Sequence, residues 1–301
     1  MKWALTLVTA AYLSALLVAA AVVVLLSPEA GPAGWPPGLF VVAVADLMAT
    51  AVVFAWSLAF RNASFYDPYW SVAPPVIGLY WWGLVGFPLD ARVLLALGLV
   101  GLWSVRLTLN WAQGWQGLPH EDWRYRNLQQ QTGRWYGLVS LLGIHGFPTV
   151  LVFVGCLPLY VVLAGAGGPL NPVDLIALSV GLGALALETR ADLQLHRFRA
   201  GAAAAGGETS GRLLQDGVWA WCRHPNYLGE IGFWVALGLF GWAAGGSLVW
   251  TFAGALAMTG LFLGISIPMI EGKLLADKRG YDRYCERVPR LLPYGVLKRG
   301  K

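Results

Sequence analysis

Residues 223–230, RHPNYLGE, bring basic, amide, phenol and carboxylate side chains together immediately before an apolar run. Pro225 suits the first turn of a helix, because the missing backbone N–H has no intrahelical partner there. Helical spacing then places Asn226 one turn before Glu230, with Tyr227 three residues before the same carboxylate. The stretch therefore predicts the start of a helix with a polar face that could hold a ligand.

Two cationic side chains, Arg223 and His224, precede this helix and flank the positive end of its dipole. Basic side chains beside the unpaired N–H groups of a helix N-terminus suit an anion such as a phosphate. Glu230 lies about one turn inside the helix, where an ionisable group costs at least a few kcal/mol unless it is paired or solvated. Glu230 is therefore a candidate functional residue; the alternative is that it pairs with an arginine merely to lock two helices.

A second charged cluster, LETRADLQLHRFR at 187–199, ends the preceding apolar run. Helical spacing keeps Glu188, Asp192 and Arg199 near one stripe, while Arg197 lies on another. A helix exposed to solvent would be equally charged. The cluster therefore indicates a ligand site only because it lies close in sequence to the helix start described above.

A third cluster, at 105–127, follows another apolar run and contains Arg106, Arg124 and Tyr125. Planar guanidinium groups bind phosphates through two N–H donors, and indole or phenol rings can stack on a flat cofactor. The alternative is an interfacial loop of Trp and Arg residues that contacts lipid headgroups.

The segment NASFYDPYWSVAPP at 62–75 places Asp67 between Tyr66 and Tyr69, just before an apolar run. Proton donors paired with a carboxylate can polarise a carbonyl group. Asp67, Tyr66 and Tyr69 are therefore candidate catalytic residues. The alternative is a simple turn, because Asp-Pro often starts one.

The elements that must position these clusters are membrane helices. Of the 301 residues 57% are hydrophobic and 12% charged, which is far more apolar than a soluble domain. Lipid offers the backbone no hydrogen-bond partner, so long apolar runs form helices. We predict an all-α, polytopic transmembrane bundle of about eight spans, at residues 3–26, 38–60, 71–88, 93–112, 136–164, 172–189, 228–244 and 248–269.

Basic residues define the orientation of these spans. With eight spans, every Lys and Arg except Arg92 falls on the side that carries both termini, and the positive-inside rule makes that side cytoplasmic. Topology thus explains the net charge of +5, which calls for no nucleic acid. We expect an integral membrane protein in contact with membrane lipid.

The remaining features point to one domain without a metal. Three cysteines and four histidines show none of the spacings that bind metal ions, so the sequence predicts free thiols and no metal site. The first apolar run exceeds the usual core of a signal peptide, and we expect it to be retained as a helix. No repeat or second domain is evident, so residues 1–301 are expected to form a single transmembrane domain.

Three segments together resemble the C-terminal half of the steroid 5-alpha-reductase family and its bacterial relatives: CRHPNYLGE, LETRADLQLHRFR and the closing GYDRYCERVPRLLPY. YDPYWSVAP and the arginine-rich segment after the fourth run are similar to the bacterial branch. The resemblance covers roughly residues 38–294. It leaves residues 1–37 as an additional N-terminal helix and loop ahead of a reductase-like bundle at 38–301.

The resemblance implies a helical bundle that holds NADPH in a cavity open to the cytoplasm, with a lipid-accessible pocket for an enone. By motif, the residues at the cofactor are Arg106, Asp192, Arg199, Asn226 and Glu230. The clusters described above add Arg124, Arg197, Arg223, His224 and Tyr227 as candidate cofactor-binding residues. Asp67 occupies the place of a glutamate that helps orient the substrate carbonyl.

Two departures from the family concern the substrate. The family's substrate-polarising tyrosine falls on Trp103, which has no acidic proton, and Glu188 stands where the reductases have an asparagine. Either Tyr66 or Tyr69 takes the tyrosine's role, or the substrate differs. The expected enzyme is an oxidoreductase acting on CH–CH groups, similar to 3-oxo-5-alpha-steroid 4-dehydrogenase, which transfers hydride from NADPH to an alpha,beta-unsaturated carbonyl in a hydrophobic lipid or steroid-like substrate.

Two other functions stay open at this point. The RHP-x-Y signature followed by Glu271 on the last helix also resembles isoprenylcysteine carboxyl methyltransferases, which use S-adenosylmethionine. Those proteins show a paired glutamate, whereas Gly272 follows here. The third alternative is a non-enzymatic membrane scaffold that binds lipid. No oligomeric state follows from the sequence.

Overall fold

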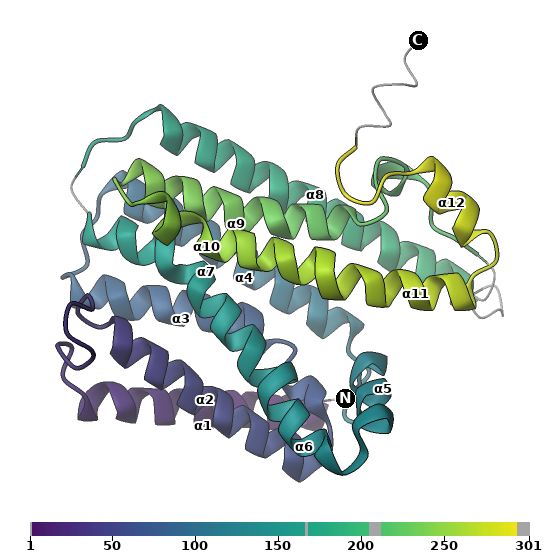
Figure 1. Ribbon diagram of the computed structural model, residues 1–301, viewed down its shortest axis with the longest axis horizontal. Coiled ribbons are helices and arrows are strands. Elements are labelled where there is room, and N and C mark those ends of the chain that lie inside the picture. Colours follow the sequence, from purple (N-terminus) through teal and green to yellow (C-terminus); the bar gives the residue numbers. More distant parts are fainter. Residues whose placement is uncertain (1, 166–167, 205–211, 294–301) are drawn as a thin grey trace. The chain divides into compact units, whose positions relative to one another are not determined.

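The computed structural model describes residues 2–165, 168–204 and 212–293, and all regular structure in those residues is helical (Figure 1). This confirms the predicted all-α fold. Several helices are apolar enough for an integral membrane protein. In this described part of the chain, six helical segments are long and apolar enough to cross a membrane: Trp3–Leu25, Leu39–Phe60, Ala91–Gly114, Trp123–Ala164, Pro172–Gly201 and Leu248–Asp277.

The other two predicted spans also form helices. Helix α3 (Tyr69–Leu84) has 16 residues, and α9 (Pro225–Ala243) has 19. Pro225 occupies the first turn of α9, as the sequence predicts. About eight spans is therefore consistent with the structure.

Two helices continue past the predicted ends of their spans. Helix α8 (Pro172–Ala204) has 33 residues, so the charged cluster at 187–199 is a helical continuation of the span. Likewise α10 (Leu248–Leu261), the π-helix η5 (Phe262–Ser266) and α11 (Ile267–Asp277) follow one another without a break. The reason is that Leu, Ala, Arg, Lys and Glu favour a helix whether or not they suit lipid, so hydropathy alone underestimates helix length.

The chain divides into two compact units, residues 1–168 and 169–301. The first contains α1 (Lys2–Leu25), α2 (Leu39–Phe60), η1 (Ala63–Phe65), α3, α4 (Ala91–Gly114), α5 (Trp123–Thr132), η2 (Gly133–Trp135), α6 (Tyr136–Val139), the π-helix η3 (Ser140–Gly146) and α7 (Phe147–Ala164). The second contains α8, η4 (Gly217–Ala220), α9, α10, η5, α11 and α12 (Tyr281–Arg287).

In the first unit, α1 packs along α2, and α3 packs against α4 and α7. The indole of Trp56 on α2 donates to Ser14 Oγ on α1 at 3.0 Å, which ties the N-terminal helix to its neighbour. Gly78 allows α3 to approach α7, because a Cβ at this position would lie 2.8 Å from Leu159 Cδ2.

In the second unit, α9 lies between α8 and α10 (Figure 1). Glycines make both approaches close: a Cβ added to Gly229 would lie 2.8 Å from the carbonyl oxygen of Ala184 on α8. On the other side, a Cβ added to Gly238 would lie 2.7 Å from the carbonyl oxygen of Thr251 on α10. The charged clusters of α8 and α9 are therefore carried by helices in backbone contact.

Candidate functional site

The segment between α2 and α3, which carries the candidate catalytic residues, is held in a defined turn. Arg61 ends α2 in the left-handed region, with φ of 50°. The Asn62 side chain caps η1 by accepting a hydrogen bond from the Ser64 N–H at 2.8 Å. Its Nδ2 donates to the carbonyl oxygens of Leu118 at 2.8 Å and His120 at 3.0 Å. These bonds fix the turn to the loop that follows α4.

The hydrogen-bond partner of Asp67 is a phenol. Tyr125 on α5 donates its O–H to Asp67 Oδ1 at 2.7 Å. Burial raises the pKa of Asp67 to about 6, although the hydrogen bond from Tyr125 and the charge of Arg124 act in the opposite direction. Such a carboxyl group can take up or release a proton close to neutral pH.

Tyr66 and Tyr69 are buried and hydrogen bond toward the helical core. The Tyr66 hydroxyl lies 2.8 Å from Thr149 Oγ1, and the Tyr69 hydroxyl donates to Asp46 Oδ1 at 2.7 Å. Burial raises the pKa of Tyr66 well above its usual value, which keeps it a neutral phenol. We define the tyrosine–aspartate site as Tyr66, Asp67, Tyr69 and Tyr125.

Helix α1 contacts this site directly. The Tyr12 hydroxyl donates to the carbonyl oxygen of Phe65 at 2.9 Å, one residue before Tyr66. The Tyr12 ring also meets the Tyr69 ring edge to face, with 6.0 Å between centroids. The additional N-terminal helix thus supports the turn that carries the candidate catalytic residues.

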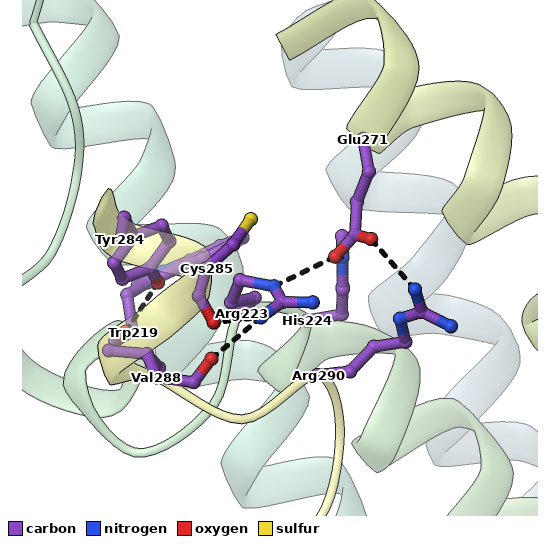
Figure 2. Close-up of polar contacts among 8 residues, drawn as sticks. All are labelled: Trp219, Arg223, His224, Glu271, Tyr284, Cys285, Val288 and Arg290. Atoms are coloured by element: carbon purple, nitrogen blue, oxygen red, sulfur yellow. Dashed lines mark hydrogen bonds and ion pairs between the residues drawn. The ribbon is translucent and has the colours of Figure 1, made fainter. Parts of the chain in front are cut away.

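A second polar cluster lies in the other unit (Figure 2). Glu271 Oε1 on α11 accepts from Arg223 Nε at 2.8 Å and lies 3.0 Å from His224 Nε2. Glu271 Oε2 lies 3.2 Å from Arg290 Nη2. The side chains of Arg223 and Glu271 are each 9% exposed, whereas that of Arg290 is 49% exposed. We define Arg223, His224, Glu271 and Arg290 as the arginine–glutamate cluster.

The chain after α12 folds back onto this cluster. Arg223 Nη1 donates to the carbonyl oxygens of Cys285 at 2.9 Å and Val288 at 2.7 Å (Figure 2). The backbone N–H groups of Arg223 and His224 donate to the carbonyl oxygens of Pro289 and Arg290, at 2.9 and 3.2 Å. Arg223 is therefore fixed by an anion on one side and by three carbonyl groups on the other.

A cavity of about 370 Å³ opens beside the cluster. Its lining includes three arginines, Arg223, Arg287 and Arg290. A concave surface rich in guanidinium groups suits a phosphate or carboxylate ligand.

Sequence comparison assigns the chain to a family. Residues 53–288 match the family described as "Protein of unknown function (DUF1295)". The chain belongs to this family. An uncharacterised protein of Schizosaccharomyces pombe is 30% identical to the DUF1295 chain over 267 residues, which cover 80% of this chain and 76% of that protein. The family is related to steroid 5-alpha-reductase-like proteins. No solved structure matches the chain.

The DUF1295 match begins inside α2 and so excludes α1. The turn at residues 62–67, whose Phe65 carbonyl oxygen accepts a hydrogen bond from Tyr12, lies inside the matched region. The N-terminal helix is therefore an addition to the matched region that reaches a candidate site within it.

The predicted cofactor residues of the second unit lie on α8 and α9 and in the turn before α9. Glu230 is buried and accepts from the indole of Trp234 at 3.0 Å. The Tyr227 ring stacks between His224 and Phe262, with centroid distances of 5.7 and 4.7 Å. Asp192 is half-buried on α8, Asn226 is half-buried in the first turn of α9, and Arg197 and Arg199 are exposed.

Two predicted cofactor residues, Arg106 and Arg124, belong to the first unit. Arg106 is half-buried on α4. Arg124 forms a two-point ion pair with Asp122, at 2.8 and 3.0 Å. That all the predicted residues share one pocket stays a prediction, because these two lie in one unit and the others in the second.

Sequence reasoning missed two carboxylates at these sites. Asp46 was not singled out, although it is the one charged side chain of α2. Glu271 entered only through the methyltransferase resemblance, and the structure places its carboxylate against Arg223 and His224. The phosphate-type ligand expected beside these two side chains stays a prediction. The signal for both carboxylates was the same: an ionisable residue inside an apolar run.

Proposed function

We propose that this protein is an integral membrane reductase that uses NADPH to reduce the C=C bond of an alpha,beta-unsaturated carbonyl in a lipid or steroid-like substrate. The observation that carries the proposal is the tyrosine–aspartate site, in which Tyr125 donates to the titratable carboxyl of Asp67 and the buried phenols of Tyr66 and Tyr69 lie close by in the sequence, at the end of apolar helices. The resemblance of its motifs to the steroid 5-alpha-reductase family suggests the same class of chemistry, whereas DUF1295 itself is a family of unknown function.

In this proposal the tyrosine–aspartate site polarises the substrate carbonyl. Tyr125 donates to Asp67 across 2.7 Å, and Asp67 in its protonated form can donate its own hydrogen bond to a carbonyl oxygen and stabilise the enolate that develops there. The neutral Tyr66 phenol is a second proton donor on the same turn. The surrounding apolar helices exclude water, which strengthens these hydrogen bonds.

Bound NADPH would supply the hydride. The residues of the second unit fit a cofactor that carries phosphates, because the cavity beside the arginine–glutamate cluster is lined by Arg287 and Arg290, both exposed. Arg223 has a different role in the proposal, since its Nε and Nη1 already donate within the protein. It positions Glu271 and the segment after α12. The cofactor side faces the cytoplasm, which the distribution of basic residues supports. The resemblance to the bacterial branch of the reductase family suggests a bacterial inner membrane.

The test is a titration of the purified protein with NADPH, followed by thermal unfolding. A ligand that binds only the folded state stabilises it by about 2.7 kcal/mol at 100 times its Kd. We expect NADPH to raise the unfolding temperature and S-adenosylmethionine to leave it unchanged. Stabilisation by neither nucleotide would exclude the reductase and favour a lipid-binding scaffold.

One observation favours a second candidate, an S-adenosylmethionine-dependent methyltransferase. Its resemblance rests on the RHP-x-Y signature and on Glu271, and these two elements are in direct contact through Arg223 and His224. Stabilisation by S-adenosylmethionine alone in the same titration would decide for this candidate.

A further inference from the structure

A buried carboxyl group lies within the membrane-spanning helix α2. Asp46 is 6% exposed and is the one charged residue among the 22 of that helix. An ionisable group inside a span costs at least a few kcal/mol unless it is paired or solvated, and its presence indicates a function. The tyrosine–aspartate site as defined above leaves Asp46 without a role.

The contacts of Asp46 suit a group that holds a proton. Tyr69 Oη lies 2.7 Å from Asp46 Oδ1 and 3.2 Å from the Asp46 carbonyl oxygen. Asp46 Oδ2 is buried and has no hydrogen-bond partner among the residues that the structure describes. Within the described ranges, the titratable groups found to interact with Asp46 are Tyr69 on α3, Tyr66 before it and Cys156 on α7, and none of these three is a cation. A neutral carboxylic acid is the form that such surroundings favour.

A series of hydroxyl groups lies between Asp46 and Tyr66. Tyr69 donates a hydrogen bond to Asp46 and interacts electrostatically with Thr50. Thr50 Oγ1 lies 2.8 Å from Thr149 Oγ1, and Thr149 Oγ1 lies 2.8 Å from the Tyr66 hydroxyl. Thr149 Oγ1 also donates to the carbonyl oxygen of His145 at 2.9 Å, so it must turn from that acceptor to pass a proton to Tyr66. Each of these hydroxyls can accept one proton and donate another, which is the requirement for proton transfer along a chain.

We propose that Asp46 supplies, through Tyr69, Thr50 and Thr149, the proton that Tyr66 donates to the substrate. This inference rests on the proposed reductase function. In the balanced step, hydride from the nicotinamide adds to the beta carbon and Tyr66 gives its proton to the resulting enolate. The O–H protons along the chain each move by one position, and Asp46 is left as a carboxylate that water later reprotonates.

Tyr66 is the last hydroxyl of this series, next to Thr149. Asp67, the neighbouring residue, has its own phenol in Tyr125. The turn from Tyr66 to Asp67 would thus bring together two proton donors. In this proposal Asp67, with Tyr125, polarises the substrate carbonyl, and Tyr66, which receives its proton from Asp46, protonates the enolate.

The experiment combines a measurement that needs no cofactor with one that does. Infrared difference spectra of the purified protein across a pH titration report protonated carboxyl groups. We expect a carboxylic acid band that disappears in Asp46→Asn and shifts in Thr149→Val, in which the chain is broken. If the wild-type band is the same in Asp46→Asn, Asp46 does not hold the proton and the inference is overturned, whatever the fate of the reductase proposal.

The second measurement follows reduction of a 3-oxo-4-ene steroid and of a long-chain aliphatic enone by NADPH. Asp46→Asn should lower kcat by roughly 10²-fold, with thermal stabilisation by NADPH unchanged, and Asp46→Glu should restore most of the rate. A loss in Asp46→Asn that Asp46→Glu does not restore indicates a structural role and contradicts the relay. If wild-type protein binds no NADPH, the reductase proposal fails and the relay fails with it as a step of that reaction, whereas the infrared result still decides whether Asp46 holds a proton.

Discussion

Removing the charge of Glu271 tests the arginine–glutamate cluster. In Glu271→Gln the side chain keeps its size, but Arg223 and His224 lose the anion between them. Breaking a buried pair by removing one partner costs about 3–5 kcal/mol, because the remaining charge stays buried. The contact with Arg290 adds at most about 1 kcal/mol, because that side chain is 49% exposed. Gln retains one acceptor oxygen, so we expect a loss of about 3 kcal/mol.

The assay is unfolding of the purified protein in detergent, with hydrogen exchange at the backbone N–H groups of Arg223 and His224. Both should exchange faster in Glu271→Gln, because their acceptors lie in the segment after α12 that the cluster holds. The control is Lys273→Ala, which removes the exposed ion pair with Asp277 at 2.7 Å and should cost no more than about 0.5 kcal/mol. Equal losses in the two variants, with unchanged exchange, would refute the buried ion pair.

Three further predictions concern stability. Burial raises the pKa of Asp67 to about 6, so the folded state binds more protons than the unfolded state between about pH 4 and 6. The free energy of unfolding should therefore fall by at most about 3 kcal/mol as pH rises through that range. Asp67→Asn should flatten this part of the stability profile, and an identical profile in the variant would contradict the assignment. Tyr12→Phe removes the hydrogen bond to the Phe65 carbonyl oxygen and should lower the free energy of unfolding by about 1 kcal/mol. Limited proteolysis should also cleave the turn after α2 faster in this variant. An unchanged cleavage rate would show that α1 does not hold the turn. Gly229→Ala should lower the free energy of unfolding by about 1–3 kcal/mol, because the new methyl group meets the backbone of α8. The control is Gly183→Ala on α8, where an added Cβ has nothing within 4 Å and should be neutral or stabilising in the same thermal scan. Similar values for the two variants would contradict the close contact between the helices.

Patterns local in sequence predicted much of the fold. Runs of apolar residues gave the helical class, and Pro225 marked the first turn of α9. Helix ends were less accurate, because α8 continues with polar residues through the segment that hydropathy assigns to the outside. The sequence therefore predicts helix ends poorly where residues favour a helix but are too polar for a membrane span.

Partners distant in sequence account for what the sequence did not predict. Arg223 and Glu271 are 48 residues apart, and neither residue indicates the other. The sequence predicted a ligand anion such as a phosphate beside Arg223 and His224, and that ligand stays a prediction. The carboxylate that the structure places against both side chains belongs to Glu271. Similarly, Asp67 and Tyr125 are 58 residues apart, and the hydrogen bond between them depends on the position of α5 in the fold, which the sequence does not indicate.

The central claim is hydride transfer to an enone, and deuterium transfer tests it most directly. Purified protein is incubated with a 3-oxo-4-ene steroid or a long-chain enone and with NADPH deuterated at its transferable position, and the products are analysed by mass spectrometry. The account predicts one deuterium on the beta carbon of a saturated carbonyl product, with the yield greatly reduced in Asp67→Ala. Unchanged enone together with methyl transfer from S-adenosylmethionine to an acceptor would contradict it.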